Sequence, residues 1–166
     1  MNKIFLIILV LILVAVLVYF GFNKLVEKTK KPEEKPIEYI TVEAFFNNDR
    51  MDPEFSCNKV FPVERKIIKT QAVARAALEE LLKGVSDQEK TEGFFTSINP
   101  GVKIQKLSID NGVAKVEFDE QLEFQVGGSC RVSAIRAQIT QTLKQFSTVQ
   151  NVIISIDGRT EDILQP

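Results

Sequence analysis

The chain opens with an apolar block, because Ile4–Phe22 reads IFLIILVLILVAVLVYFGF and contains no charged residue. A helix of these 19 residues would be roughly 28 Å long at 1.5 Å per residue, which matches the hydrocarbon core of a bilayer. Tyr19 and Phe20 lie near its end, where aromatic side chains often sit at the membrane interface. The block lacks the polar face of a soluble core helix. It predicts a transmembrane anchor over residues 1–22.

A cleaved signal peptide is the alternative interpretation of this block. The apolar region of such a peptide is usually about 7–15 residues and ends at a small-x-small site. This block is longer, and its end, Val-Tyr-Phe-Gly-Phe-Asn, offers no such site. No cysteine stands directly after the block, which excludes lipoprotein processing. We expect an uncleaved, single-pass membrane anchor.

Residues 23–36 read NKLVEKTKKPEEKP and are dominated by lysine, glutamate and proline. Such a segment cannot bury enough surface to fold, and its prolines favour extended backbone. It predicts a linker that separates the anchor from a folded domain over residues 37–166. A contact between its lysines and anionic lipid headgroups is the alternative role.

The first part of this domain alternates in polarity. Ile37–Phe46 has the period of two that is typical of a strand, and residues 49–58 are polar and irregular. A second extended segment is expected over Val60–Ile68, where Pro62 favours the edge of a sheet. The segment QAVARAALEELLKG that follows has an apolar stripe at helical spacing. Thr70 is expected to cap the start of this helix and Gly84 to follow its end.

The second part of the domain starts with a hairpin signal. Asn111-Gly112 separates two alternating runs, and a break in period at Gln105 predicts a β-bulge. A second helix is expected over Cys130–Phe146. Val152–Ile156 is almost continuously apolar, as in a central strand, and Asp157-Gly158 ends it. The polar residues of the second helix are expected to lie mostly away from its buried stripe; these are Arg131, Arg136, Gln138, Gln141, Lys144 and Gln145.

The order of elements is therefore β(β)-α-β-β-α-β. This order predicts an α+β domain in which two helices pack on one face of a small sheet.

Composition removes several classes of function. The formal net charge of −1 provides no basic field for nucleic acid. The absence of histidine excludes Ser-His-Asp and Cys-His catalysis and the usual zinc sites. Two cysteines cannot form a four-thiolate metal site within one chain. We expect no enzymatic activity, no cofactor and no small-molecule substrate.

Three local motifs have a chemical and a structural interpretation. Asp119, Glu120 and Glu123 contain the two carboxylates that a glycosidase needs, but residues this close in sequence favour a solvated loop. Gly127-Gly128 before a helix resembles an anion-binding start, yet no phosphate-loop lysine follows. Asp157-Gly158-Arg159 is interpreted as a turn.

Three blocks of sequence resemble the GerMN domain of bacterial sporulation and germination proteins. They are ARAALEELLKG (74–84), EGFFTSINPGVKIQKLSIDNGVAKVEFD (92–119) and RAQITQTLKQFSTVQNVIISIDG (136–158). The resemblance implies a fold similar to the ring-building motif of secretion and sporulation channels. It also implies attachment to a membrane, an extracytoplasmic position and no catalytic residues.

Cys57 and Cys130 are the two thiols of the chain. In an oxidising compartment they are expected to form a disulfide that ties residues 49–58 to the start of the second helix. Two unpaired buried cysteines are one alternative. A reactive Cys130 at a helix N-terminus is the other.

The orientation of the anchor rests on opposing signals. Lys24, Lys28, Lys30 and Lys31 follow the helix, and by the positive-inside rule they would place the domain in the cytoplasm. The cysteine pair and the family resemblance favour the outside. We therefore expect a single-pass cell-membrane protein with an extracytoplasmic, non-catalytic interaction or assembly domain that binds a protein partner or itself. The alternatives are a sporulation or germination factor and a cell-wall protein that binds or modifies a ligand.

Overall fold

The computed structural model describes residues 2–28, 36–54 and 56–165. The chain divides into two compact units, Met1–Pro36 and Ile37–Pro166, which are described separately. The first unit contains helix α1, Lys3–Lys28. The helix therefore continues past Phe22 into the first residues of the predicted linker. The rest of that linker prediction, residues 29–35, lies outside the described residues.

From Ile4 to Phe22, helix α1 is apolar around its whole circumference. The span Leu6–Lys24 is long and apolar enough to cross a membrane, and none of its described residues is buried within the protein. The helix continues beyond Phe22 because Leu25, Glu27 and Lys28 are good helix formers and the first proline comes at Pro32.

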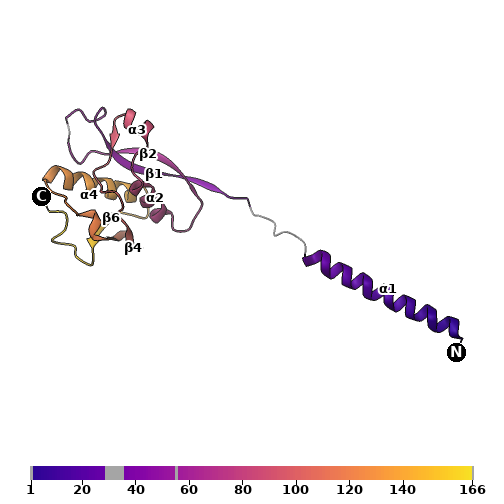
Figure 1. Cartoon of the computed structure of the whole chain (residues 1–166). Helices are drawn as coiled ribbons and strands as arrows, with labels where there is room; N and C mark the ends of the chain where they lie inside the picture. Colours follow the sequence, from indigo (N-terminus) through magenta and orange to yellow (C-terminus); the bar gives the residue numbers. More distant parts are fainter. Residues whose placement is uncertain (1, 29–35, 55, 166) are drawn as a thin grey trace. The chain divides into compact units, whose positions relative to one another are not determined.

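The second unit contains short strands and helices that Figure 1 labels in chain order. Their bounds are β1 Tyr39–Asn48, β2 Phe61–Ile68, α2 Val73–Leu82, α3 Asp87–Thr91, β3 Phe94–Phe95, β4 Ile104–Asp110, β5 Val113–Phe118, the 3-10 helix η1 Glu120–Leu122, α4 Ser129–Lys144 and β6 Asn151–Ile156.

The strands of the described part of this unit form two sheets. One has the order β2-β1-β3 and is antiparallel; the other has the order β4-β5-β6, in which β5 and β6 run parallel. Helices α2 and α4 both pack on β1, and α4 also contacts β6. In Figure 1 the two helices lie between β1–β2 and β4–β6. The α+β class is confirmed, but the strands form two small sheets where one was expected.

Strand β6 corrects the expectation of a central strand at Val152–Ile156. It pairs with β5 on one side, so β5 is the central strand of the sheet. Ile154 and Ile156 are buried, whereas Ile153 points outward and is 41% exposed. A nearly continuous apolar run therefore occupies an edge here, with one face in the core and one face outside.

The hairpin between β4 and β5 is confirmed. Asn111 and Gly112 have φ of 47° and 80°, the left-handed conformation that a tight two-residue turn between strands requires. The predicted bulge is also present, because the register shifts between Ile104 and Lys106.

For helix α2, the predicted end is confirmed and the predicted N-terminal cap is wrong. Thr70 does not cap it: α2 starts at Val73, and the Thr70 hydroxyl accepts a hydrogen bond from the N–H of Ala72 at 3.2 Å. That short-range bond forms a turn before the helix. Gly84 follows the helix with φ of 77° and donates its N–H to the carbonyl of Leu81, as expected.

One main hydrophobic core joins both sheets and both helices. Its largest fully buried side chains come from every layer, which explains why the domain packs as one unit. They include Phe46, Leu78, Leu81, Phe118, Leu122, Ile135, Ile139, Leu143, Ile156 and Ile163.

Candidate functional site at the Cys57–Cys130 bridge

The two cysteines come from elements that are far apart in sequence. Cys57 lies in the long connection between β1 and β2, and Cys130 lies in the first turn of α4. The structure joins their sulfur atoms, with the Cα atoms 5.0 Å apart and 73 residues of separation. That Cα distance is within the usual range for a disulfide. The bridge links the β1–β2 connection to the start of α4.

The β1–β2 connection is also held by its own side chains. The Asn48 side-chain oxygen accepts hydrogen bonds from the N–H groups of Arg50 and Met51, at 2.9 and 3.0 Å. The Asp52 carboxylate accepts bonds from the N–H and the hydroxyl of Ser56, at 2.8 and 2.9 Å. Both Asn48 and Asp52 are buried. This segment is irregular in secondary structure but fixed by a specific set of bonds.

A buried polar chain connects this segment to helix α4. Gln138, which is 0% exposed, donates to the side-chain oxygen of Asn47 at 2.6 Å and accepts from the hydroxyl of Thr96 at 2.8 Å. Asn47 in turn donates to the carbonyls of Cys57 and Lys59, both at 3.0 Å. The polar side of α4 was expected to include Gln138, and this was wrong. Gln138 is a core residue because each end of its amide has a partner.

Two further side chains, Thr142 in α4 and Gln145 directly after its last residue, cover the edge of β1 that faces away from β2. Gln145 accepts from the N–H of Glu43 at 2.8 Å and donates to its carbonyl at 2.6 Å. The Thr142 hydroxyl accepts from the N–H of Phe45 at 3.0 Å. The Gln145 amide thus makes the pair of bonds that a neighbouring strand would make. Sequence reasoning missed Asn47, Thr142 and Gln145, since polar side chains on a strand and a helix give no signal of mutual pairing.

A pocket of about 290 Å³ lies beside the bridge. Arg131 lies in its wall and donates to the carbonyls of Ser97 and Gln125 and to the side-chain oxygen of Asn99. These polar groups are already bonded within the domain, so the pocket offers mainly contact surface. Its lining consists of Asn47, Asn48, Asp49, Asp52, Cys57, Phe95, Ser97, Cys130, Arg131 and Ala134.

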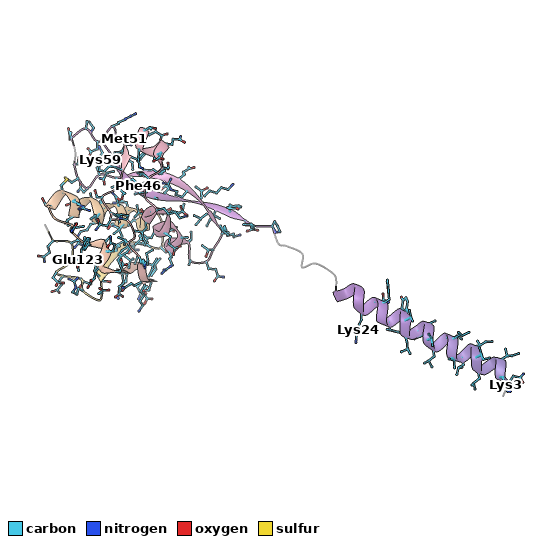
Figure 2. All side chains as sticks on the ribbon, viewed as in Figure 1. Lys3, Lys24, Phe46, Met51, Lys59 and Glu123 are labelled. Carbon is cyan, nitrogen blue, oxygen red and sulfur yellow. A yellow bond between two sulfur atoms is a disulfide. The ribbon has the colours of Figure 1, made fainter. Side chains whose placement is uncertain are left out.

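Two of the three acidic residues after the hairpin, Asp119 and Glu123, act in structural contacts, and Glu120 is exposed. Asp119 accepts the N–H of Lys103 at 3.0 Å. Glu123 pairs with Arg159 and also accepts the N–H of Leu164. The hydrogen bond that Arg159 donates to the Glu123 carboxylate raises the pKa of Arg159 above its ordinary value. These contacts hold Arg159 and Leu164 onto the domain. Figure 2 labels Glu123.

The two glycine motifs shape the backbone. Gly128 has φ of 85° and precedes the first residue of α4, so the Gly127-Gly128 pair sets the entry into that helix. Asp157 and Gly158 have φ of 46° and 79° and form the predicted turn, which ends in a bridge between Ile156 and Arg159. Among the described residues there is no cluster of His, Cys, Asp or Glu that suits a metal ion.

A half-buried ion pair joins β2 to α3. The guanidinium of Arg65 donates two hydrogen bonds to the Glu89 carboxylate, at 2.6 and 2.8 Å. Burial alone would raise the pKa of Glu89, but its bonds from Arg65 and Ser86 lower the pKa below its ordinary value of 4.5. Glu89 and Ser86 also form a capping box at the start of α3. The Ser-x-x-Glu spacing is the sequence signal that would have predicted this helix.

The comparisons with known proteins agree with this fold. Residues 44–162 match the model of the family Germane, described as "Sporulation and spore germination". The first GerMN domain of the sporulation protein GerM from Bacillus subtilis superposes with a TM-score of 0.53 and 19% identity, over 73% of this chain and 85% of that one.

The tandem GerMN domains of the same Bacillus subtilis protein give a TM-score of 0.54 and 17% identity over 74% of this chain. The match spans 41% of the tandem chain. No curated protein sequence is similar enough to this chain to count as a match. The family match covers β1 from Ala44 onward and all the later strands and helices of the domain, and we conclude that this chain belongs to the Germane family of GerMN-type domains.

Proposed function

We propose that this chain is a single-pass membrane protein whose GerMN-type domain lies outside the cytoplasm and binds a protein partner or a second copy, without catalysis. The observation that carries the proposal is the joining, in one chain, of an apolar helix and a Germane-family domain that contains a bonded cysteine pair. Every described side chain in the span Leu6–Lys24 is accessible. Such a surface is stable in lipid and costly in water.

The bridge between Cys57 and Cys130 supports the outside orientation. Disulfides persist in oxidising compartments and are rare in the cytoplasm. The bridge lies at the meeting point of the β1–β2 connection and α4, where it would stabilise a segment that has little secondary structure. The lysines that follow the apolar block oppose this orientation by the positive-inside rule, so the orientation requires a direct test.

The contacts of the acidic residues support a non-catalytic role. Asp119 and Glu123 are engaged by Lys103, Arg159 and Leu164 in bonds that hold the fold together. A glycosidase needs two carboxylates directed at one substrate bond. Most polar side chains around the pocket are likewise bonded to their neighbours, which favours a surface for binding over a site for chemistry. These are Asn47, Asn48, Asp52 and Arg131.

Membrane extraction and a reporter fusion test the anchor and the orientation together. The full chain should stay in the membrane pellet after alkaline carbonate and dissolve in detergent. A β-lactamase fused after residue 166 should protect the bacterial cells that produce it against ampicillin. A control chain that lacks residues 1–22 should appear in the soluble fraction and give no protection. Release by carbonate, or ampicillin sensitivity of the full fusion, would contradict the proposal.

Chemical crosslinking tests the interaction role in the same membranes. We expect lysine-reactive crosslinkers to convert the full chain into discrete larger species. The control is α1 and the linker fused to an unrelated folded domain, which should stay at its own size. Equal behaviour of the two proteins would argue against a specific binding role for the domain.

The family description favours a second candidate, a role in sporulation or spore germination. In a spore-forming source organism, deletion of the gene should lower the yield of heat-resistant spores or delay their germination. Wild-type spore yield and germination in the deletion strain would eliminate this candidate and leave a general role in the cell envelope.

A further inference from the structure

The ends of β1 and β2 nearest the linker carry an unpartnered apolar surface. Ile37, Tyr39 and Ile68 are 62%, 52% and 60% exposed. Tyr39 and Ile68 are direct cross-strand partners, so their side chains lie on the same face of the ribbon. We call the surface of Ile37, Tyr39, Lys66 and Ile68 the ribbon-end face.

The opposite face of the same ribbon is covered by the domain. Ile40, Val42 and Ile67 pack against Ala77 of α2 in a small buried cluster. The exposure of the ribbon-end face is therefore not a general fraying of the strands. The pairing even continues beyond the strands, since the N–H of Lys69 donates to the carbonyl of Glu38 at 2.8 Å.

The composition of the ribbon-end face suits the interfacial zone of a bilayer. Tyrosine prefers the boundary between headgroups and acyl chains, where its ring is buried and its hydroxyl is hydrated. The ammonium of Lys66 lies 4.9 Å from the centre of the Tyr39 ring. A lysine at this place can direct its charge to lipid phosphates while its alkyl chain stays on the apolar surface.

The covalent connection to α1 limits how far this face can be from lipid. Nine residue steps separate Lys28, the last residue of α1, from Ile37. A fully extended chain gains at most about 3.3–3.6 Å per residue, so these steps reach roughly 32 Å at most. Among the surfaces of the domain, the ribbon-end face is the one next to this tether in the chain.

A second copy of the chain fits this face less well than lipid. A stable protein interface buries about 800 Å² on each partner. Three apolar side chains at the end of a two-stranded ribbon supply a fraction of that area. Lipid needs no matching partner surface, and the tether supplies a high local concentration of it.

We propose that the ribbon-end face inserts into the headgroup boundary of the membrane in which α1 is anchored, and so holds the domain at the bilayer surface. This inference rests on the proposed membrane anchor. It adds a second, reversible contact that sets which parts of the domain remain available to partners.

The absence of tryptophan from the sequence allows a direct test. The Tyr39→Trp variant of the full chain has one tryptophan, at the centre of the ribbon-end face. It is reconstituted into phosphatidylcholine–phosphatidylglycerol vesicles, with or without lipids brominated on the upper acyl chain. We expect the tryptophan fluorescence of the variant in vesicles to peak at a shorter wavelength than that of the denatured variant. Brominated lipids should quench most of this fluorescence. Ile68→Trp, directly across the ribbon, should behave in the same way.

Phe124→Trp is the matched control. Phe124 is 58% exposed, similar to Tyr39. It adjoins Glu123, which Figure 2 places at the end of the domain away from the start of β1. Bromine should leave the emission of this control unchanged.

The outcomes separate this inference from the anchor itself. Flotation of the chain with vesicles in a density gradient tests the anchor separately. If the chain floats but bromine quenches the Tyr39→Trp variant no more than the Phe124→Trp control, the inference is overturned and the anchor stands. Equal quenching of both variants would also overturn it, because it would show a general collapse of the domain onto lipid. A chain that does not float would refute the anchor and the inference together.

Discussion

Gln138 is a polar residue on which the core of this domain depends. Its amide joins Thr96 to Asn47, and Asn47 holds the carbonyls of Cys57 and Lys59. A buried network of this kind is stabilising when every member is satisfied and costly when one is removed. The network therefore couples the position of the bridge-bearing segment to the packing of α4.

The Gln138→Leu variant should lose about 1–3 kcal/mol of unfolding free energy, because it leaves the buried side-chain oxygen of Asn47 without a donor. Chemical denaturation of the full chain in detergent measures this loss, and hydrogen exchange should become faster at residues 57–59. Gln141→Leu is the matched control, since Gln141 is exposed on the same helix. Equal stability of the two variants would show that the network contributes nothing.

The ionisation of Glu89 should make the unfolding free energy depend on pH in the acid range. Its pKa in the folded protein is lowered below the ordinary value of 4.5, with bonds from Arg65 and Ser86 outweighing burial. The stabilisation by ionised Glu89 is therefore complete above pH 4.5 and is lost as the pH falls through the folded pKa. The Glu89→Gln variant should have a flatter stability profile below about pH 5, measured by denaturation at several pH values.

Glu79→Gln is the control for Glu89. Glu79 pairs with Arg75, and both side chains are exposed, at 53% and 41%, so water screens the pair. Its substitution should leave the acid profile close to that of the unaltered chain. Identical profiles for Glu89→Gln and the unaltered chain would refute the role of the Arg65–Glu89 pair.

At the scale of elements, α4 completes the sheet that contains β1. The Gln145 amide bonds both backbone groups of Glu43, and Thr142 bonds the N–H of Phe45. Unpaired strand edges are sites of unwanted association, and covering them is one way in which proteins prevent it. Helix α4 thus both fills the core and closes an edge.

The Gln145→Ala variant should lose about 1–2 kcal/mol of unfolding free energy and expose the β1 edge. Hydrogen exchange at the Glu43 amide should become faster, and the variant should aggregate at a lower protein concentration. Gln141→Ala on the exposed side of α4 controls for the substitution itself. Unchanged exchange at Glu43 would mean that the edge is protected by other groups.

The sequence predicted the elements whose signals are local. Asn111-Gly112 identified the hairpin and Gly84 the end of α2, because both depend on backbone conformations that few residues adopt. The break in the alternating pattern at Gln105 identified the bulge. Helix α3 had a local signal as well, in Ser86 and Glu89, which was not used. The cap at Thr70 failed because its hydroxyl bonds the nearer N–H of Ala72.

The arrangement of the elements was less accessible. An apolar run such as Val152–Ile156 fits a central or an edge strand, and the choice depends on which strands are adjacent in the fold. The pairing of Gln138 with Asn47 spans 91 residues and leaves no periodic trace in the sequence. The proximity of Cys57 and Cys130 was predicted because the chain has two cysteines and a single possible pairing.

At the scale of the whole molecule, the chain combines an apolar helix with a Germane-family domain. Specific side chains cover the β1 edge of that domain and bind Arg159 and Leu164. The orientation of that domain decides which partners it can meet. It also decides whether the thiols of Cys57 and Cys130 meet an oxidising environment. Orientation is therefore the central claim of the proposed function.

Thiol labelling in intact cells tests this claim most directly. A membrane-impermeant maleimide is applied to cells that produce the full chain, with and without prior reduction, and labels per chain are counted by mass shift. If the domain lies outside, we expect no labelling before reduction and labelling of Cys57 and Cys130 after it. Thiols that resist labelling in intact cells but react after lysis without reductant would place the domain in the cytoplasm and contradict the account.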